Sequence, residues 1–351
     1  MYYLFETRLT PLTTVRRQRI LPAPGEVLVR AGQRVEPTQA VAQTHLPDDF
    51  RILPLAHLLG VPPSRVKRYL SVGPGDTVQE GQTVAKRFGH LVKSPINGVV
   101  TASGSGRMLI EAQLILFELY AYIPGTISDV LENYGVIIET TGAVVQGAWG
   151  AGNESFGVLK CLTHDPDEPL HAKSIDPSCH GTIIIGGSGL DSTVLEAAQE
   201  LQVRGIVTGG VPPELIPQVK QLTFPVVVTE GIGTAPMSTP IFHLLATNDG
   251  REAAISGKVQ LRWDVVRPEV IIPLPADASV PAQAQPPGSP LTVGTLVRAV
   301  RAPYAGKSGR VVKLPARARL IDTGAKVRGA EVDLGQEAPV FIPLANLEIL
   351  R

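Results

Sequence analysis

Three glycine-rich stretches in the middle of the chain have the composition of loops that approach an anion. Each follows a short apolar run typical of a buried strand, at Thr182–Ile185, Gly205–Val207 and Phe224–Val228. Glycine lets a backbone come close to a phosphate, and a helix starting after the first stretch adds partly positive N–H groups. The candidate anion-binding residues are Gly186, Gly187, Ser188, Gly189, Thr208, Gly209, Gly210, Thr229, Glu230 and Gly231.

This first stretch, G-G-S-G-x-D, is neither a dinucleotide fingerprint nor a P-loop, because no G-K-[S/T] follows it. Two interpretations therefore stay open: a site for a phosphorylated small molecule, or tight turns that only close the strand ends. We predict no catalytic residue, since no Ser–His–Asp order, H-E-x-x-H or paired-carboxylate motif stands out.

A second cluster has the residue types of a metal site. Thiolates and imidazoles are zinc ligands, but the spacing C-x2-H-x6-H-x7-C-H matches no ligand pattern that we can justify, and the stretch equally suits a polar connector. The candidate ligands are Cys161, His164, His171, Cys179 and His180. Because the chain has only two cysteines, a four-cysteine iron–sulfur or zinc centre within one chain is excluded.

The last sixty residues are basic, although the whole chain has 32 Lys/Arg and 32 Asp/Glu. From Thr292 to Arg351, ten Lys/Arg stand against five Asp/Glu, a net charge of about +5. A domain of that charge attracts phosphates. The candidate nucleic-acid-binding residues are Arg298, Arg301, Tyr304, Lys307, Arg310 and Lys313.

Within this basic domain, the stretch from Val293 to Val312, with the turn Pro303-Tyr304-x-Gly306-x-x-Gly309, resembles the KOW motif. That motif opens small SH3-like barrels in NusG-type transcription factors and some ribosomal proteins. The resemblance implies a β-barrel over residues 292–351 that contacts RNA, a ribosome or a polymerase. Many such barrels bind proteins instead, so both kinds of partner stay open.

The N-terminal third contains an internal repeat with the spacing G-x-x-V-x-x-[G/T]-Q-x-V-A. Its copies are Gly32–Ala42 and Gly75–Ala85. We expect two strands joined by a tight turn in each copy, with glycines at positive φ and the valines facing one core. Asn97-Gly98, farther along, predicts a hairpin.

The second copy, GDTVQEGQTVA, and the following KSPINGVV resemble the barrel-sandwich hybrid fold of biotinyl and lipoyl carrier domains. The same fold serves as a non-carrier module in efflux adaptors, RNA polymerase subunits and Rnf/Nqr-type redox complexes. No lysine occurs between Ser94 and Leu159, so the chain lacks an amine for biotin or lipoate there. We therefore expect no cofactor and a structural or docking role.

These elements predict a multidomain protein: an all-β barrel-sandwich hybrid, a small α/β Rossmann-like domain with a parallel sheet, and a C-terminal SH3-like β-barrel. The expected boundaries are 1–159, with an extension over 121–159, then 160–270 and 292–351. The span 271–291 is rich in proline and nearly uncharged, which indicates a stiff linker that cannot form a central strand.

Our functional prediction is a non-enzymatic binding or scaffold protein that assembles protein partners and contacts RNA through the KOW domain. The alternatives are a peripheral subunit of an Rnf/Nqr-like redox complex, or an enzyme that binds a phosphorylated small molecule at the 186–233 glycine loops. Glu6 and Arg8 interrupt the apolar core that a signal peptide needs, and no apolar run is long enough to span a bilayer. We therefore expect a cytoplasmic protein with no membrane span.

Overall fold

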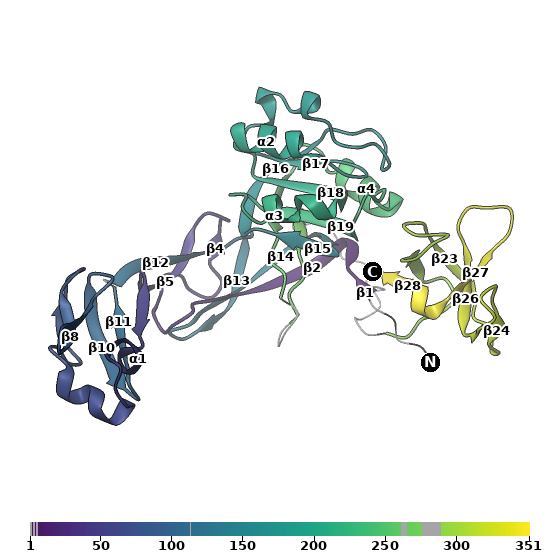
Figure 1. Ribbon diagram of the computed structural model, residues 1–351. Coiled ribbons are helices and arrows are strands. Elements are labelled where there is room, and N and C mark those ends of the chain that lie inside the picture. Colours follow the sequence, from purple (N-terminus) through teal and green to yellow (C-terminus); the bar gives the residue numbers. More distant parts are fainter. Residues whose placement is uncertain (1, 3, 5, 113, 261–264, 276–288) are drawn as a thin grey trace.

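The computed structural model describes residues 2, 4, 6–112, 114–260, 265–275 and 289–351, and it consists mainly of β-strands arranged in several sheets (Figure 1). A central body carries a projecting lobe on one side and the C-terminal domain on the other. None of the helices within these ranges is both long and apolar enough to cross a membrane.

The central body is built on an eleven-stranded sheet, in which β2 (Leu9–Ile20) pairs with β14 beside the main path. Four neighbouring strands, β16 to β19, run parallel, as the alternation of strands and helices predicts. The remaining pairs in this sheet are antiparallel. The path runs β15 (Trp149–Ala151), β19 (Val226–Ile232), β18 (Gly205–Val211), β17 (Thr182–Ile185), β16 (Glu154–Cys161), β20 (Glu252–Ser256), β21 (Glu269–Pro273), β14 (Gly135–Gln146), β13 (Gly125–Leu131) and β4 (Arg34–Val35).

Helices cover both faces of the parallel part of this sheet. Ile183 and Ile185 point into a core shared with α4 (Thr239–Ala246), whereas Ile184 points into a core shared with α2 (Ser192–Glu200) and α3 (Ile216–Val219). Alternate residues of β17 are thus buried on opposite faces, which explains why this strand is a continuous apolar run. Short 3-10 turns at Ala172–Ser174, Pro177–Cys179 and Pro213–Leu215 complete this region.

The sheet does not break at two of the predicted boundaries. Strand β16 crosses the expected junction at residue 159, because it pairs with β20 on one side and β17 on the other. Strand β21 extends to Pro273, inside the predicted linker, and lies between β14 and β20. Pro273 ends the strand, where a missing N–H is tolerated. The rest of that predicted linker lies largely outside the described residues.

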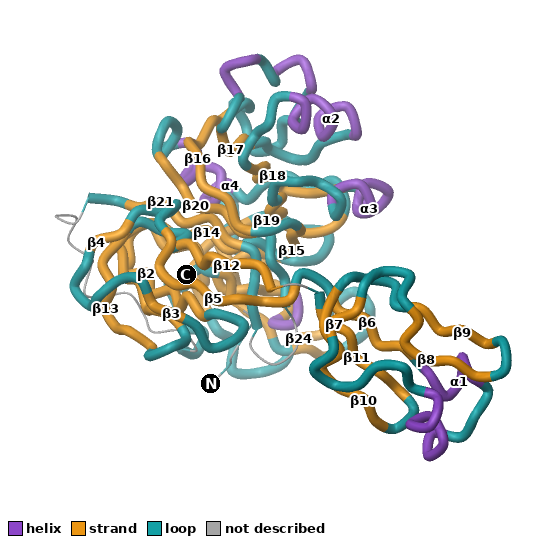
Figure 2. Tube along the Cα trace, turned by 90° about the vertical axis from the view of Figure 1, so that its left-hand side faces the viewer, coloured by secondary structure: helices purple, strands orange, loops and turns teal. Residues whose placement is uncertain are grey.

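Residues 49–112 form the lobe, which stands apart from the body in both views (Figures 1 and 2). Its core draws only on residues between Leu53 and Ile110. The two ends of the segment meet, since Ala112 N–H donates to Asp49 O at 2.8 Å. The lobe contains β6 (Phe50–Leu53), α1 (Leu55–Leu59), a 3-10 helix (Pro63–Tyr69), β7 (Thr77–Val78), β8 (Thr83–Arg87), β9 (His90–Lys93), β10 (Gly98–Gly104) and β11 (Arg107–Glu111).

A three-stranded ribbon joins the lobe to the body: β12 (Leu114–Tyr120), β5 (Ala40–Pro47) and β3 (Glu26–Val27). The two repeat copies lie on opposite sides of this ribbon. Their glycines do adopt positive φ (80° at Gly32 and 96° at Gly75) and their valines are buried. However, Val35 and Val41 belong to the core of the body, and Val78 and Val84 to that of the lobe, so the expectation of one shared core is wrong.

The hairpin predicted at Asn97-Gly98 is also wrong. β9 pairs with β8, whereas β10 pairs with β11 and β7, so this dipeptide connects two sheets. Asn97 Oδ1 instead accepts a hydrogen bond from Glu80 N–H at 2.8 Å. Two tight turns of the lobe lie elsewhere, at Phe88-Gly89 between β8 and β9 and at Ser105-Gly106 between β10 and β11, and all four residues have positive φ.

The C-terminal domain has a six-stranded sheet in the order β1-β28-β22-β23-β26-β27. Five of these strands lie within residues 292–351, where the resemblance to the KOW motif implies a β-barrel, and the sixth comes from the other end of the chain. That strand is β1, which pairs in parallel with β28 and continues into β2 of the body. The strands are β1 (Glu6–Thr7), β22 (Leu296–Ala299), β23 (Ser308–Lys313), β26 (Gly329–Asp333), β27 (Val340–Pro343) and β28 (Leu347–Leu350), with a small ladder of β24 (Arg319–Leu320) and β25 (Lys326–Val327) and a 3-10 turn at Leu344–Asn346.

Candidate functional site

The glycine-rich loops meet at the carboxyl ends of the parallel strands, as the topology requires. Gly209 N–H donates to Gly187 O at 2.7 Å, and Gly210 lies opposite Gly231 in the ladder between β18 and β19. The structure therefore brings together all three groups of predicted anion-binding residues.

The chain itself fills the space above these loops. Ser188 N–H donates to Glu168 O at 3.0 Å, and Ala235 N–H donates to Ser188 O at 3.2 Å. A Cβ atom on Gly209 would lie 2.3 Å from Ala235 O, and one on Gly187 would lie 2.3 Å from Glu168 O. These two glycines thus allow backbone to pack on backbone, and the geometry favours the interpretation of the loops as close-packed turns.

The helix that follows the first glycine loop begins with an acidic cap. The Asp191 carboxylate accepts hydrogen bonds from Val194 N–H at 3.0 Å and from the Thr193 hydroxyl at 2.6 Å. These bonds, that from Thr193 foremost, hold the pKa of Asp191 below its usual value. The N-terminus of α2 therefore already interacts with a negative charge of this chain.

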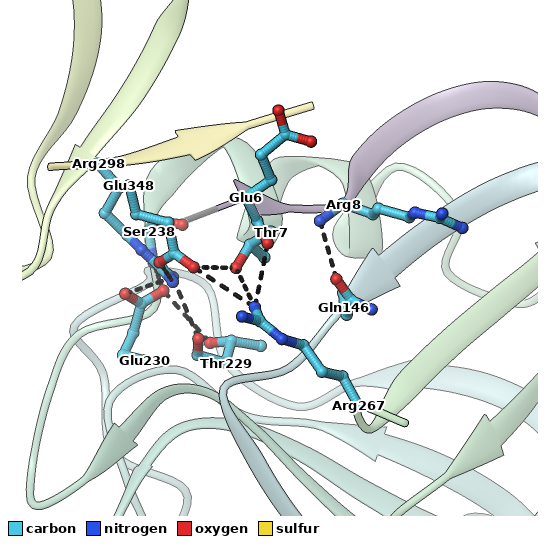
Figure 3. Close-up of polar contacts among 10 residues, drawn as sticks. All are labelled: Glu6, Thr7, Arg8, Gln146, Thr229, Glu230, Ser238, Arg267, Arg298 and Glu348. Carbon is cyan, nitrogen blue, oxygen red and sulfur yellow. Dashed lines mark hydrogen bonds and ion pairs between the residues drawn. The ribbon is translucent and has the colours of Figure 1, made fainter. Parts of the chain in front are cut away.

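The Glu230 carboxylate belongs to an ion-pair cluster with residues of the C-terminal domain (Figure 3). Arg298 Nη1 lies 2.7 Å from Glu230 Oε2 and Arg298 Nη2 lies 2.5 Å from Glu348 Oε2. The side chains of Arg298 and Glu230 are only 3% and 4% exposed. Around them, the Thr7 hydroxyl donates to Glu348, and Arg267 Nη1 lies 3.6 Å from that carboxylate. We call these five residues the buried ion-pair cluster.

The buried ion-pair cluster pairs two cations with two carboxylates, although at Glu230 burial outweighs Arg298 and raises the pKa of the carboxyl group. Burial alone would lower the pKa of the Arg298 guanidinium, but the carboxylates of Glu230 and Glu348 outweigh burial and hold that pKa above its usual value. Glu230 Oε1 also accepts a hydrogen bond from Ser238 N–H at 2.9 Å. The cluster joins β19 of the body to β22 and β28 of the C-terminal domain.

This arrangement corrects one predicted nucleic-acid-binding residue. Arg298 is not on the surface, because it is enclosed between two carboxylates, and its guanidinium is not available to a phosphate. Tyr304 is half-buried against the core of the C-terminal domain. The other predicted residues are exposed: Arg301 and Lys307 on the loop before β23, and Arg310 and Lys313 on β23.

The cysteine–histidine cluster does not assemble around a common point. Cys161 packs at the edge of the core that contains α4, whereas Cys179 is buried in the core on the opposite face of the sheet. Cys161 Sγ donates to Thr163 O at 3.2 Å, and His180 Nδ1 lies 3.1 Å from Leu201 O. His164 and His171 are exposed, and no group of three metal-ligating side chains occurs among the residues that the structure describes.

The structure also shows two surfaces that the sequence did not predict and that could bind a ligand or a partner. One is a cleft of about 910 Å³ between β2 and the C-terminal domain, which we call the arginine cleft. Charged residues from both ends of the chain line it: Glu6, Arg8, Arg16, Arg17, Arg310 and Arg351. The pair Arg16-Arg17 is a sequence signal for one wall of this cleft. The other wall comes from the opposite end of the sequence, so the sequence does not show that the two walls meet.

The other is an apolar surface on the ribbon and the adjoining edge of the lobe, which we call the β12 surface. Its large side chains are between 38% and 57% exposed. Because consecutive strand residues face opposite sides, Leu114 and Leu116 lie on one face of β12, and Ile115 and Phe117 lie on the other. The register continues from Leu114–Pro47 in the ribbon to Glu111–Phe50 in the lobe. The β12 surface consists of Phe50, Ile52, Leu114, Ile115, Leu116 and Phe117.

Comparison with known proteins assigns no family to this arrangement, since no family model matches the chain and no curated protein matches it.

Proposed function

We propose that this protein is a non-enzymatic scaffold that binds a protein partner on the β12 surface. The observation that supports this proposal most is the run Leu114–Phe117, in which four large apolar side chains are all at least 38% exposed. Exposed apolar surface of this kind, here on both faces of one strand, marks interaction sites. β12 is also the outer strand of its three-stranded sheet, so it has one edge that no strand covers among the described residues. Such an edge can accept a further strand.

The finer domain assignments belong to the same proposal. The lobe corresponds to the barrel-sandwich hybrid, since it contains both sequence stretches that carry that resemblance, 75–85 and 93–100. The four parallel strands with helices on both faces support a Rossmann-like module, and residues 292–351 support an SH3-like KOW module. In this proposal the ribbon and the adjoining edge of the lobe present the partner surface, and the body and the C-terminal domain form its base.

The test compares complexes formed by the wild-type chain and by Leu114→Lys/Leu116→Lys, purified from cells and analysed by native mass spectrometry. Because both side chains are about half exposed, the substitutions should leave the melting temperature nearly unchanged. We expect a stoichiometric heteromeric complex for the wild type and loss of that complex for the variant. Thr101→Lys, at an exposed position of β10, is the control and should keep the complex.

Two results would contradict the proposal. One is a wild-type chain that runs only as a species of 37.3 kDa. The other is a complex that persists in Leu114→Lys/Leu116→Lys but disappears in Thr101→Lys.

RNA binding is the second candidate function. The exposed cationic side chains on β23 and on the loop between β22 and β23 favour it. Arg301, Lys307 and Lys313 have no ion pair with the carboxylates of the described residues. If RNA binds through these side chains, the logarithm of the affinity should fall linearly with the logarithm of the salt concentration. The double variant Arg301→Glu/Lys307→Glu should make that slope less steep. An affinity that is independent of salt would remove this candidate.

A further inference from the structure

The arginine cleft unites elements that are distant in the sequence. One wall comes from the junction of β1 and β2 and from β2 itself, with Arg8, Arg16 and Arg17. The opposite wall comes from the C-terminal domain, with Arg310 on β23 and Arg351 after β28. Five threonines also line it, so guanidinium groups and hydroxyls surround the same volume.

Three of the five guanidinium groups are paired with carboxylates of this chain. Arg17 makes a two-pronged pair with Glu269, and its Nε lies 2.7 Å from Glu269 Oε1. Arg16 Nε lies 2.7 Å from Glu139 Oε1, and Arg351 Nη1 lies 2.8 Å from Glu6 Oε1. These ion pairs hold the three arginine side chains in place. They also neutralise Glu6, the one acidic side chain that lines the cleft among the described residues.

The other two guanidinium groups have no carboxylate partner in the described part of the chain. Arg8 and Arg310 are both exposed, and they face the cleft from opposite walls. Arg310 Nη1 donates to Gly294 O at 2.9 Å, which positions the group but does not neutralise it. For Arg8, the hydrogen bond to Gln146 comes from its backbone N–H and leaves the side chain uninvolved. The cleft therefore carries two uncompensated positive charges.

We propose that the arginine cleft binds an oligophosphate, either free or as the phosphate chain of a nucleoside polyphosphate. A guanidinium matches the oxygens of a phosphate with two parallel hydrogen bonds, and two such groups on opposite walls require a ligand with more than one anionic group. A volume of about 910 Å³ is that of a site for a small molecule. Val15, Val144 and Leu296 supply an apolar part of the lining, where a base would fit. This site is separate from the β12 surface and does not depend on the proposed scaffold role.

The test is isothermal titration calorimetry of the full chain with sodium tripolyphosphate and, separately, with ATP, at low salt. We expect saturable binding of one ligand per chain. Arg8→Gln and Arg310→Gln should each weaken it about tenfold or more, because each removes a charged hydrogen-bonding group. Since both side chains are exposed, the variants should melt like the wild type, which excludes misfolding as the cause.

Arg317→Gln is the matched control, an exposed arginine in the same domain that does not line the cleft, and it should bind like the wild type. Tighter binding of ATP than of tripolyphosphate would assign the source as a nucleoside polyphosphate, and equal affinities would assign a free oligophosphate. The proposal is overturned if neither probe binds at millimolar concentration, or if Arg317→Gln weakens binding as much as Arg8→Gln. It is also overturned if an RNA oligonucleotide binds while both probes do not.

Discussion

At the scale of single residues, Arg298 determines how the C-terminal domain attaches to the body. Its guanidinium lies between Glu230 of β19 and Glu348 of β28, and its Nη1 also donates to Thr229 O at 3.1 Å. A buried arginine is tolerated only where carboxylates and hydrogen bonds compensate its charge. Arginine residues therefore both make the C-terminal domain basic and, through Arg298, attach this domain to the body.

Arg298→Met should lower the free energy of unfolding by about 3–5 kcal/mol, because it leaves the buried Glu230 without its cation and Glu348 with only the more distant Arg267. Chemical denaturation measures the loss. Arg51→Met is the control: its ion pair with Asp49 is exposed on the lobe, and its loss should cost less than about 1 kcal/mol. Equal losses for the two variants would show that the cluster does not bear on stability.

At the scale of elements, the close approach of the loops above β17 and β18 depends on particular glycines. A Cβ on Gly209 would lie 2.3 Å from Ala235 O and 2.6 Å from Gly187 O, whereas the nearest atoms to a Cβ on Gly189 are 3.7 Å away. Two glycines of the same predicted anion site thus differ in the space around them.

Gly209→Ala should therefore destabilise the protein by about 2–3 kcal/mol, because backbone atoms must shift to admit the methyl group. Gly189→Ala, which has room for the methyl group, should change the stability by less than about 1 kcal/mol. Thermal unfolding of the two variants measures this difference. An anion site in these loops would instead require Gly189→Ala to abolish phosphate binding while Gly209→Ala remained stable.

Strand β2 is fixed to the sheet by two half-buried arginines, Arg17 and Arg19, which lie on the same face of the strand as the buried Val15. Arg17 pairs with Glu269, and Arg19 makes hydrogen bonds of 3.0 and 2.8 Å to the carboxylate of Glu154, which Lys258 also contacts. Burial raises the pKa of Glu154, but Arg19 and then Lys258 outweigh burial and hold it below its usual value. The ionised form of Glu154 is therefore stabilised by folding.

This shift gives a pH dependence with a definite sign. A carboxyl group whose pKa is lowered by folding contributes stability above its usual pKa of 4.5 and loses that contribution as the pH falls through the lowered value. The unfolding free energy of the wild type should exceed that of Glu154→Gln by the largest amount near neutral pH. That difference should shrink steadily below about pH 4.5 in urea denaturation series. A difference that stays constant down to about pH 3 would contradict the assigned contacts.

The sequence predicts where strands and helices lie better than it predicts which strands pair and which side chains form ion pairs. Helix α2 and the parallel strands follow from local signals of turn and periodicity, and the resemblance to the KOW motif implies the β-structure of the C-terminal domain. The alternation in β2 shows only that one face is buried, and pairing with β14 is a long-range choice of register. Likewise, the sequence around Arg298 indicates a surface cation because its two carboxylates are 68 and 50 positions away.

At the scale of the whole molecule, the two ends of the chain are combined in one unit, and the lobe is an insertion into it. β1 pairs with β28, and Leu9 and Leu350 share the core of the central sheet. The lobe instead has its own core, and its two ends meet at Asp49 and Ala112. The body and the C-terminal domain should therefore unfold together, and the lobe separately.

A fragment spanning residues 49–112 should fold by itself, with low stability because a chain of this length buries a small core. A dispersed amide spectrum by NMR with a cooperative thermal transition would confirm this. The complementary deletion variant, in which a short turn replaces residues 50–111, should keep the melting transition of the body. A fragment with a collapsed, undispersed spectrum would mean that the ribbon is needed to complete the lobe.

The most direct test of the proposed function is site-specific photocrosslinking in cells, with a photoreactive amino acid at Leu116 of the β12 surface. We predict one discrete crosslinked protein from this position and none from Thr101 of β10, which is also exposed. A crosslink from Thr234, which lies over the glycine loops, combined with none from Leu116, would contradict the scaffold role of the β12 surface and would place the interaction at the carboxyl edge of the parallel strands.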